Sequence, residues 1–162
     1  MRRPFQVLVI PYIKEGDKYF YALFKRKDLN IWQAIAGGGE GNESPTKTFR
    51  REAFEEAGID QNSPYIRLSS ITTIPVVNIH GFLWGNNIIM VPEIAFGVEV
   101  FSKELVVSNE HTEYEWVECS RALKRLRYDS NRSAVWELDY LLNNGVKDVS
   151  KNIQIIERYY KQ

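Results

Sequence analysis

The sequence predicts a mixed domain of the α/β or α+β class, in which strands stand before and after one central helix and further helices close the chain. Three observations lead to this prediction. Short apolar runs rich in β-branched and aromatic residues fill most of the chain, one capped helix interrupts them, and apolar residues near the end recur at helical spacing. No repeat or Pro/Ser-rich linker interrupts the sequence, so we expect residues 1–162 to form a single domain.

The predicted strands are apolar segments bounded by turn residues. The run from Phe5 to Ile13 ends at KEGDK, where Gly16 supplies the permissive φ of a hairpin turn before a second run, Tyr19 to Phe24. A third strand, Ile31 to Ala36, ends in three glycines. The remaining predicted strands span residues 66–77, 88–101 and 113–118.

The central helix has both of its ends marked in the sequence. Ser44 is placed to cap it, Pro45 suits the first helical position, and Gly58 ends it after Ala57. Apolar residues at helical spacing predict further helices toward the C-terminus. These helices span residues 120–126, 131–143 and 150–162.

Composition and charge argue against several classes of protein. Twenty-one basic and 21 acidic side chains cancel, which does not suit a nucleic-acid-binding domain. Cys119 is the only cysteine, so an intramolecular disulfide or a zinc finger is excluded and we expect a reducing, cytoplasmic compartment. No apolar run reaches the ~18 residues of a membrane-spanning helix. Pro11 and the charged KEGDK interrupt the N-terminal apolar run, which is therefore interpreted as a strand rather than a signal peptide.

The segment from Gly37 to Ile59 carries the chemistry. Glu52, Glu55 and Glu56 fall within an arc of about 100° on the predicted helix, beside an apolar stripe that would dock on a sheet. Three carboxylates this close repel one another unless a positive charge lies among them. Mg²⁺ takes carboxylate oxygens and bridges substrate phosphates, so a metal site is predicted; a solvated acidic helix face is the plain alternative. The apolar stripe consists of Phe49, Ala53 and Ala57.

The residues before this helix favour the metal site. A glycine-rich loop, Gly37 to Gly41, would let the backbone approach a ligand closely. The loop carries Glu40 and leads into Glu43. Arg51, which adjoins the carboxylates, could pair with Glu43 and so tie the loop to the helix.

This segment resembles the signature of the Nudix hydrolases, G-x5-E-x7-R-E-U-x-E-E-x-G-U, where U is a bulky aliphatic residue. Ala53 is the one departure, being small at the first U position. The resemblance implies an α/β/α sandwich with a mixed β-sheet, and hydrolysis of a nucleoside diphosphate linked to some group X. The matching residues are Gly37, Glu43, Arg51, Glu52, Glu55, Glu56, Gly58 and Ile59.

The same resemblance implies roles for these residues. Glu52, Glu55 and Glu56 would bind one to three Mg²⁺ ions, which Mn²⁺ could replace, and a water would attack phosphorus while a carboxylate accepts its proton. Arg51 and Glu43 would form a structural pair. Gly37 would lend its backbone to the site, and Glu40 could touch the metal through water.

The general base in this family often lies outside the signature, on a later loop. Glu110, just before a predicted strand, is the candidate for the base and for a further metal ligand. His111 is its weaker rival, and a plain surface glutamate is the alternative for Glu110. The predicted catalytic set is Glu55, Glu56, Glu110 and Arg51.

Beyond the signature, the chain resembles a narrower branch, the dihydroneopterin triphosphate and dATP pyrophosphohydrolases. The resemblance rests on RRPFQVLVIPYI near the N-terminus, FKRKDLNIWQAIAGG before the signature, and EHTEYEWVE and YDSNRSAVWELDYLL near the end. It implies Mg²⁺-dependent cleavage of the α–β phosphoanhydride of a (deoxy)nucleoside or pterin triphosphate, which yields a monophosphate and pyrophosphate.

Several residues could bind such a substrate. Arg3 and Arg26 could contact phosphates, although Arg26 and Lys27 could equally form a solvated charge pair. Trp32 could stack on a base or pterin ring, or belong to the core. Asn131 could bind the head group, or cap a helix. Gly37 and Gly38 complete the predicted substrate-binding set.

Two other functions stay open at this point. Other Nudix hydrolases act on dinucleoside polyphosphates or nucleotide sugars, and this chain could do the same. A non-catalytic nucleotide sensor is a remote alternative, because such sensors usually lose carboxylates that are all present here. We expect a monomer or homodimer whose partner is a small-molecule nucleotide or pterin polyphosphate, with neither nucleic acid nor membrane as a partner.

Overall fold

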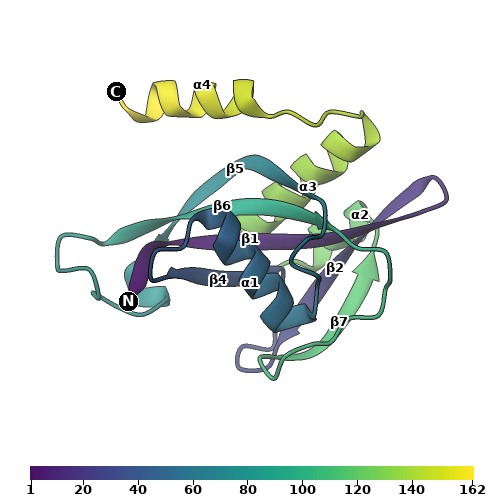
Figure 1. Cartoon of the computed structure of the whole chain (residues 1–162), viewed down its shortest axis with the longest axis horizontal. Coiled ribbons are helices and arrows are strands. Elements are labelled where there is room, and N and C mark those ends of the chain that lie inside the picture. Colours follow the sequence, from purple (N-terminus) through teal and green to yellow (C-terminus); the bar gives the residue numbers. More distant parts are fainter.

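The computed structural model describes residues 1–162 and contains a seven-stranded mixed sheet with helices on both faces (Figure 1). The strand order is β3–β2–β1–β6–β5, with β4 also paired to β1 and β7 to β2. Only β1 and β6 run parallel. The elements are β1 (Arg2–Glu15), β2 (Lys18–Arg26), β3 (Trp32–Gln33), β4 (Ile35–Glu40), α1 (Pro45–Ala57), β5 (Tyr65–Pro75), the short 3₁₀ helix η1 (Val76–Asn78), β6 (Met90–Glu99), β7 (His111–Val117), α2 (Cys119–Arg125), α3 (Asp129–Asn143) and α4 (Ser150–Tyr160).

The alternation along β1 separates two apolar cores, one on each face of the sheet. Leu8 and Ile10 pack with the residues of α3, whereas Val7 and Val9 pack with the apolar stripe of α1. Successive side chains of a strand point to opposite faces, so β1 buries both of its faces. This layering confirms the predicted fold class, and it places α1 and α3 on opposite sides of the sheet (Figure 1).

The ends of α1 are formed as the sequence predicts. The side chain of Ser44 accepts a hydrogen bond from the N–H of Lys47, and Pro45 begins the helix. Gly58 follows Ala57 with φ of +66°, and its N–H returns to the last turn of the helix. These local interactions fix where the helix begins and ends, and therefore where its acidic residues lie.

The glycine-rich segment is a strand, which corrects the predicted loop at 37–41. β4 runs through three consecutive glycines and pairs with β1; only Gly41, with φ of +52°, lies in the turn that follows. Other side chains pack directly on this strand and leave no space for a Cβ. The nearest atoms to an added Cβ are the Glu52 carboxyl carbon at Gly37 (2.0 Å), the Arg2 guanidinium at Gly38 (2.5 Å) and the Phe5 ring at Gly39 (2.3 Å).

Two boundaries near the site also differ from prediction. The strand expected at 31–36 is divided into β3 and β4, because the N–H of Ala34 leaves the sheet and donates to the Oδ1 of Asn131 at 2.8 Å. The helix expected at 131–143 begins earlier, at Asp129. Asn131 is therefore inside the helix and its side chain does not cap it.

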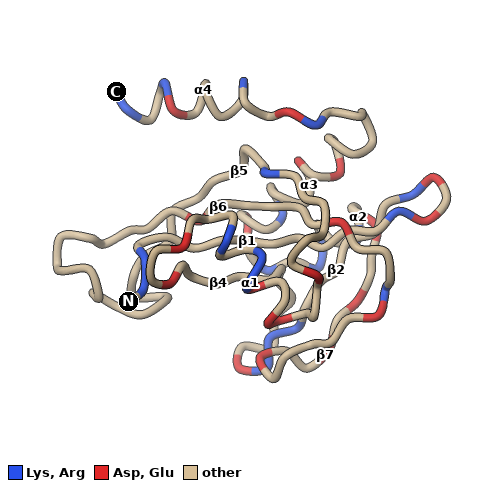
Figure 2. The backbone as a smooth tube through the Cα atoms, viewed as in Figure 1, with Lys and Arg blue, Asp and Glu red and all other residues tan.

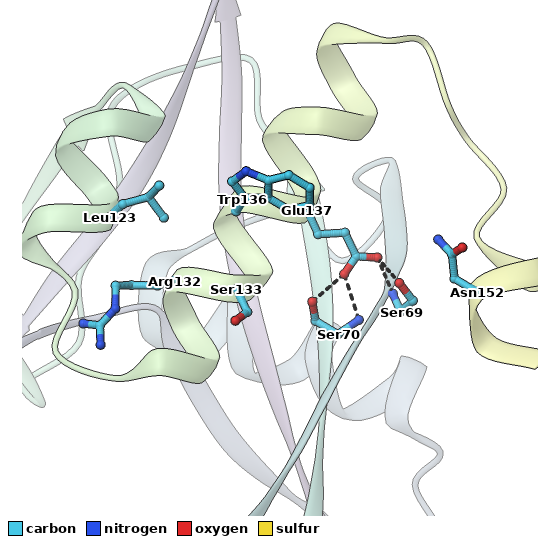
Figure 3. Close-up of a pocket in the computed structure, with 8 residues that line it drawn as sticks. All are labelled: Ser69, Ser70, Leu123, Arg132, Ser133, Trp136, Glu137 and Asn152. Carbon is cyan, nitrogen blue, oxygen red and sulfur yellow. Dashed lines mark hydrogen bonds between the residues drawn. The ribbon is translucent and has the colours of Figure 1, made fainter. Parts of the chain in front are cut away.

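A buried carboxylate joins α3 to the edge strand β5. The pairing of β5 with β6 shifts register between Arg67 and Ile71. At that irregularity the N–H groups of Ser69 and Ser70 donate to Glu137, at 2.6 and 2.8 Å (Figure 3). Both serine hydroxyls also donate to Glu137. The carboxylate therefore accepts the backbone N–H groups that have no partner on β6 at the bulge.

The connection between β5 and β6 projects from the sheet and carries no charged side chain between Arg67 and Glu93 (Figure 2). It folds back to the N-terminal strand, where the indole N–H of Trp84 donates to the carbonyl of Arg2 at 2.8 Å. At the other end of the chain, α4 lies beside β5, outside the three layers formed by the sheet and the helices on its two faces (Figure 1). None of the helices has the length and apolar character needed to span a membrane.

Candidate active site

The α1 helix buries two of its three acidic side chains. Glu52 and Glu56 are buried, whereas Glu55 is exposed. Both buried residues lie next to the stripe that includes Phe49 and Ala53, so docking of the stripe carries them against the sheet. A solvated acidic face, the plain alternative, therefore describes only Glu55.

Arg51 joins the strand and the helix, as the predicted pairing with Glu43 requires. Its guanidinium donates to both carboxylate oxygens of Glu43, at 2.9 and 3.0 Å. This two-pronged pairing holds the pKa of Glu43 at about 2, well below its usual range. The other acceptors of Arg51 are the carbonyl of Gly38 (2.9 Å) and the carboxylates of Glu52 (2.8 Å) and Glu55 (3.0 Å).

Glu52 lies against Gly37, where no side chain larger than hydrogen fits. Burial raises the pKa of Glu52 to about 7, although the adjacent Arg51 favours the ionised form. The charges of Glu56 and Glu55 raise that pKa further. One arginine therefore does not compensate for three neighbouring carboxylates, and the site has an excess of negative charge.

Glu56 contacts a histidine from β7 that sequence reasoning treated as secondary. The Nε2 of His111 lies 2.8 Å from a carboxylate oxygen of Glu56, with only 1% and 7% of the two side chains exposed. Burial raises the pKa of Glu56, and His111 opposes that effect. The other ring nitrogen of His111 is buried without a partner, and Phe24 packs on the ring. His111 thus fixes the position of Glu56.

Glu110 lies one residue earlier, in the turn that leads into β7, and its side chain is exposed. Its carbonyl accepts a hydrogen bond from the N–H of Lys27 at 3.0 Å, which attaches the turn to the end of β2. The negative charge of Glu110 contributes to the raised pKa of Glu56. The fold therefore brings Glu110 to the same end of α1 as Glu56.

These residues fit a hard divalent cation. In this structure no three of the His, Cys, Asp or Glu side chains converge on one point. Arg51 contacts Glu52, and His111 contacts Glu56. The donor set is nevertheless all carboxylate oxygen, two of its members are buried, and burial raises the pKa of both despite the neighbouring Arg51 and His111. Mg²⁺ prefers such oxygen donors and would supply that charge.

The basic residues predicted to contact phosphate lie in different surroundings. Arg3 is exposed, whereas the guanidinium of its neighbour Arg2 packs against Gly38. The sequence predicted Arg3 for this role, but only the register of β1 shows that Arg2 is the arginine that packs on β4. Arg26 donates to the carboxylate of Asp28 from Nε at 2.8 Å, with a second bond from its Nη2.

Trp32 and Asn131 are both engaged within the protein. Trp32 packs against the core on the α3 face, and the guanidinium of Arg125 lies 4.7 Å from the centre of its ring. The side-chain amide of Asn131 accepts a hydrogen bond from the N–H of Ala34 and donates one to the hydroxyl of Ser130. This arrangement agrees with the core alternative for Trp32.

Comparison with known proteins identifies the family. The NUDIX domain model matches residues 3–136. The chain belongs to the Nudix hydrolase family. Dihydroneopterin triphosphate diphosphatase from Haemophilus influenzae is 28% identical over 140 residues, which cover 85% of this chain and 87% of that protein. This similarity agrees with the narrower resemblance seen in the sequence.

Solved Nudix structures agree in fold. A protein from Listeria monocytogenes described as a NUDIX hydrolase superposes with a TM-score of 0.83 at 36% identity, covering 91% of this chain and 99% of that chain. Escherichia coli dihydroneopterin triphosphate pyrophosphohydrolase superposes with a TM-score of 0.71 at 22% identity, covering 86% of this chain and 97% of that one. The second similarity is one of fold alone.

This Nudix protein has a second feature that sequence reasoning missed, on the α3 face of the sheet. A cavity of about 210 Å³ lies between β5, β6 and the start of α3. Glu93 lines it and is buried, with 6% of its surface exposed. Burial raises the pKa of Glu93 to about 7, and the hydroxyl of Ser130 partly opposes this. The alternation of side chains along a strand could have predicted that Glu93 faces inward, but the sequence could not show that it lines a cavity.

Proposed function

We propose that the protein is a metal-dependent pyrophosphohydrolase of a nucleoside or pterin triphosphate. It cleaves the α–β phosphoanhydride bond, and the products are a monophosphate and pyrophosphate. The observation that carries this proposal is the burial of two neighbouring carboxylates with too little positive charge, Glu52 against β4 and Glu56 against His111 of β7. The similarity to dihydroneopterin triphosphate diphosphatases supports the choice of a triphosphate.

Separate residues would bind the metal and orient its ligands. Glu52, Glu55 and Glu56 would hold Mg²⁺, or Mn²⁺ in its place, with Glu110 as a further ligand. When bound, the metal neutralises charge on the polyphosphate and lowers the pKa of the attacking water. Arg51 fixes the orientation of Glu52 and Glu55 through the hydrogen bonds it donates to them.

Phosphate binding is assigned to the strand beside the carboxylates. Gly37 and Gly38 carry no Cβ, so Glu52 and Arg2 pack directly on the strand, and Arg2 supplies a positive charge against Gly38. Arg26 lies at the end of β2, where Asp28 holds its guanidinium in place. We assign Arg2 and Arg26 to phosphate contacts.

Glu110 is assigned as the general base, and replacing it with glutamine is expected to lower kcat by about 10²-fold. An amide keeps the size of the side chain but does not accept the proton of the attacking water. The measurement is kcat for wild type and Glu110→Gln, with Glu113→Gln as an exposed control on β7. A loss below about threefold would remove Glu110 from the mechanism.

Gly37→Ala is expected to displace Glu52 and to lower turnover by at least about 10-fold, with a loss of roughly 1–3 kcal/mol in the free energy of unfolding. The added methyl group would lie 2.0 Å from the carboxyl carbon of Glu52. Gly41→Ala is the control, because its Cβ meets open space although φ is +52°. It should cost stability but not turnover, measured by urea unfolding and by product release. Equal losses of turnover would contradict the role of Gly37.

The proposed reaction is tested by product analysis. The purified protein is incubated with Mg²⁺ and, in turn, dihydroneopterin triphosphate, common nucleoside triphosphates, diadenosine polyphosphates and ADP-ribose. A monophosphate and pyrophosphate from a triphosphate would support the proposal. Turnover confined to diadenosine polyphosphates or ADP-ribose would overturn the substrate class, and no turnover with either Mg²⁺ or Mn²⁺ would overturn the activity.

A further inference from the structure

The cavity on the α3 face contains a carboxylate, Glu93, that has no basic partner and only the hydroxyl of Ser130 as a nearby donor. Glu93 is more than nine-tenths buried, and no basic side chain contributes to its pKa; only burial and the hydroxyl of Ser130 do. A buried carboxylate costs free energy unless it has a partner. Its cavity-lining position therefore points to a ligand that supplies the missing hydrogen-bond donors.

The cavity is connected to the phosphate-binding strand through the sheet. Glu93 pairs with Gln6 on β1, and Gln6 pairs with Gly38 on β4, so the three residues form one row across three strands. Two strand spacings put Glu93 about 10 Å from Gly38. Opposed residues of a sheet project to the same face, so Glu93 also shares a face with the guanidinium of Arg2. Glu52 packs on the opposite face of β4, at Gly37, so one substrate molecule with its head group at Glu93 would extend its phosphates past Gly38 and over the edge of β4 to reach the carboxylates.

The size and lining of the cavity suit a flat heterocycle. Its volume of about 210 Å³ is below the roughly 300–1,000 Å³ of pockets for drug-sized ligands, which fits one ring system rather than a whole nucleotide. Leu8 and Ala95 supply apolar contacts from the sheet, and Ser130 supplies a hydroxyl. Ser70 and Ser133 line both this cavity and a larger neighbouring one, which is drawn in Figure 3, so longer head groups have space to extend.

An ionised carboxylate only accepts hydrogen bonds, and its two oxygens accept two parallel N–H groups. The 2-amino-4-oxopyrimidine ring of guanine and of pterins presents such a pair, a ring N–H beside an exocyclic amino group. The corresponding edge of adenine presents one acceptor and one donor. Against a carboxylate, the adenine acceptor would face a second acceptor and would be left unpaired.

We propose that Glu93 determines head-group specificity, and that it selects a heterocycle with a ring N–H beside an amino group, as in pterins and guanine, over adenine. This inference rests on the proposed triphosphate hydrolysis for its kinetic readout. It distinguishes pterin and guanine head groups from adenine, whereas the sequence and the family resemblance allow both pterin and dATP-like substrates.

The kinetic test compares kcat/KM for dihydroneopterin triphosphate, dGTP and dATP with Mg²⁺. Wild type should prefer the first two over dATP by at least about 30-fold, the scale expected when a buried polar group would be left unpaired. Glu93→Gln should lower kcat/KM for the first two by a similar factor. It should raise kcat/KM for dATP, because an amide offers the donor and the acceptor that adenine needs. Glu99→Gln, on the same strand outside the cavity, is the control and should leave all three within about threefold.

A fall in kcat/KM for dihydroneopterin triphosphate and dGTP together with a rise for dATP would distinguish head-group recognition from a general structural effect. Equal losses for all three substrates in Glu93→Gln, or a wild-type preference for dATP, would overturn the inference. A titration of the wild type with dGMP and dAMP, followed by ¹H–¹⁵N NMR, needs no turnover. Tighter binding of dGMP would support the role of Glu93 even if no triphosphate were hydrolysed, whereas equal or reversed affinity would refute it independently of the proposed reaction.

Discussion

Glutamine in place of Glu56 is expected to reduce kcat by at least about 10³-fold without unfolding the protein. Glu56 is buried at the end of α1 and is proposed to hold the metal. An amide removes one negative charge, and a loss of several kcal/mol of transition-state stabilisation corresponds to this factor. The fold should persist, because glutamine has nearly the same shape and still forms a hydrogen bond with His111.

The measurement pairs kcat with Mn²⁺ affinity, determined by electron paramagnetic resonance. Glu157→Gln is the control, because Glu157 is an exposed glutamate on α4. Glu56→Gln should bind Mn²⁺ more weakly and keep the circular dichroism spectrum of the wild type. A variant with normal turnover would show that Glu56 is not part of the metal site, and a variant with an unfolded spectrum would show that its contact with His111 needs the charge.

The parts of the site that could be predicted from the sequence are those that local interactions fix. The caps at Ser44 and Gly58 are determined within one helical turn, so the bounds of α1 follow from the sequence. Helical periodicity then places the three glutamates on one face. Arg51 reaches Glu43 because the two residues are only eight positions apart, across one turn and the start of the helix.

The parts that could not be predicted depend on strand register. A run of glycines is compatible with a flexible loop, and its pairing with β1 and the packing of Glu52 against Gly37 show that it is a tightly packed strand. The contact of His111 with Glu56 joins residues 55 positions apart. It depends on the pairing of β7 with β2, where a shift of one residue would turn His111 away from Glu56.

Replacing Glu93 with glutamine is expected to stabilise the protein at high pH and to have little effect at low pH. Burial raises the pKa of Glu93 from the ordinary value of 4.5 to about 7. Between these values the folded protein retains a proton that the unfolded chain releases. Stability therefore falls as the pH rises from 4.5 to 7 and is constant with respect to this group above 7. Glutamine has no charge to bury, so the variant lacks this decline.

The difference in unfolding free energy between Glu93→Gln and wild type should grow by about 2 kcal/mol from pH 5 to pH 8, measured by urea unfolding at each pH. Subtracting wild type from variant cancels the titration of the other buried carboxylates, because both proteins contain them. Glu99→Gln should give a difference that does not change with pH in this way. Parallel curves for wild type and Glu93→Gln would mean that Glu93 ionises normally in the folded protein. Its carboxylate would then already have a partner, and the free acceptor in the cavity would not exist.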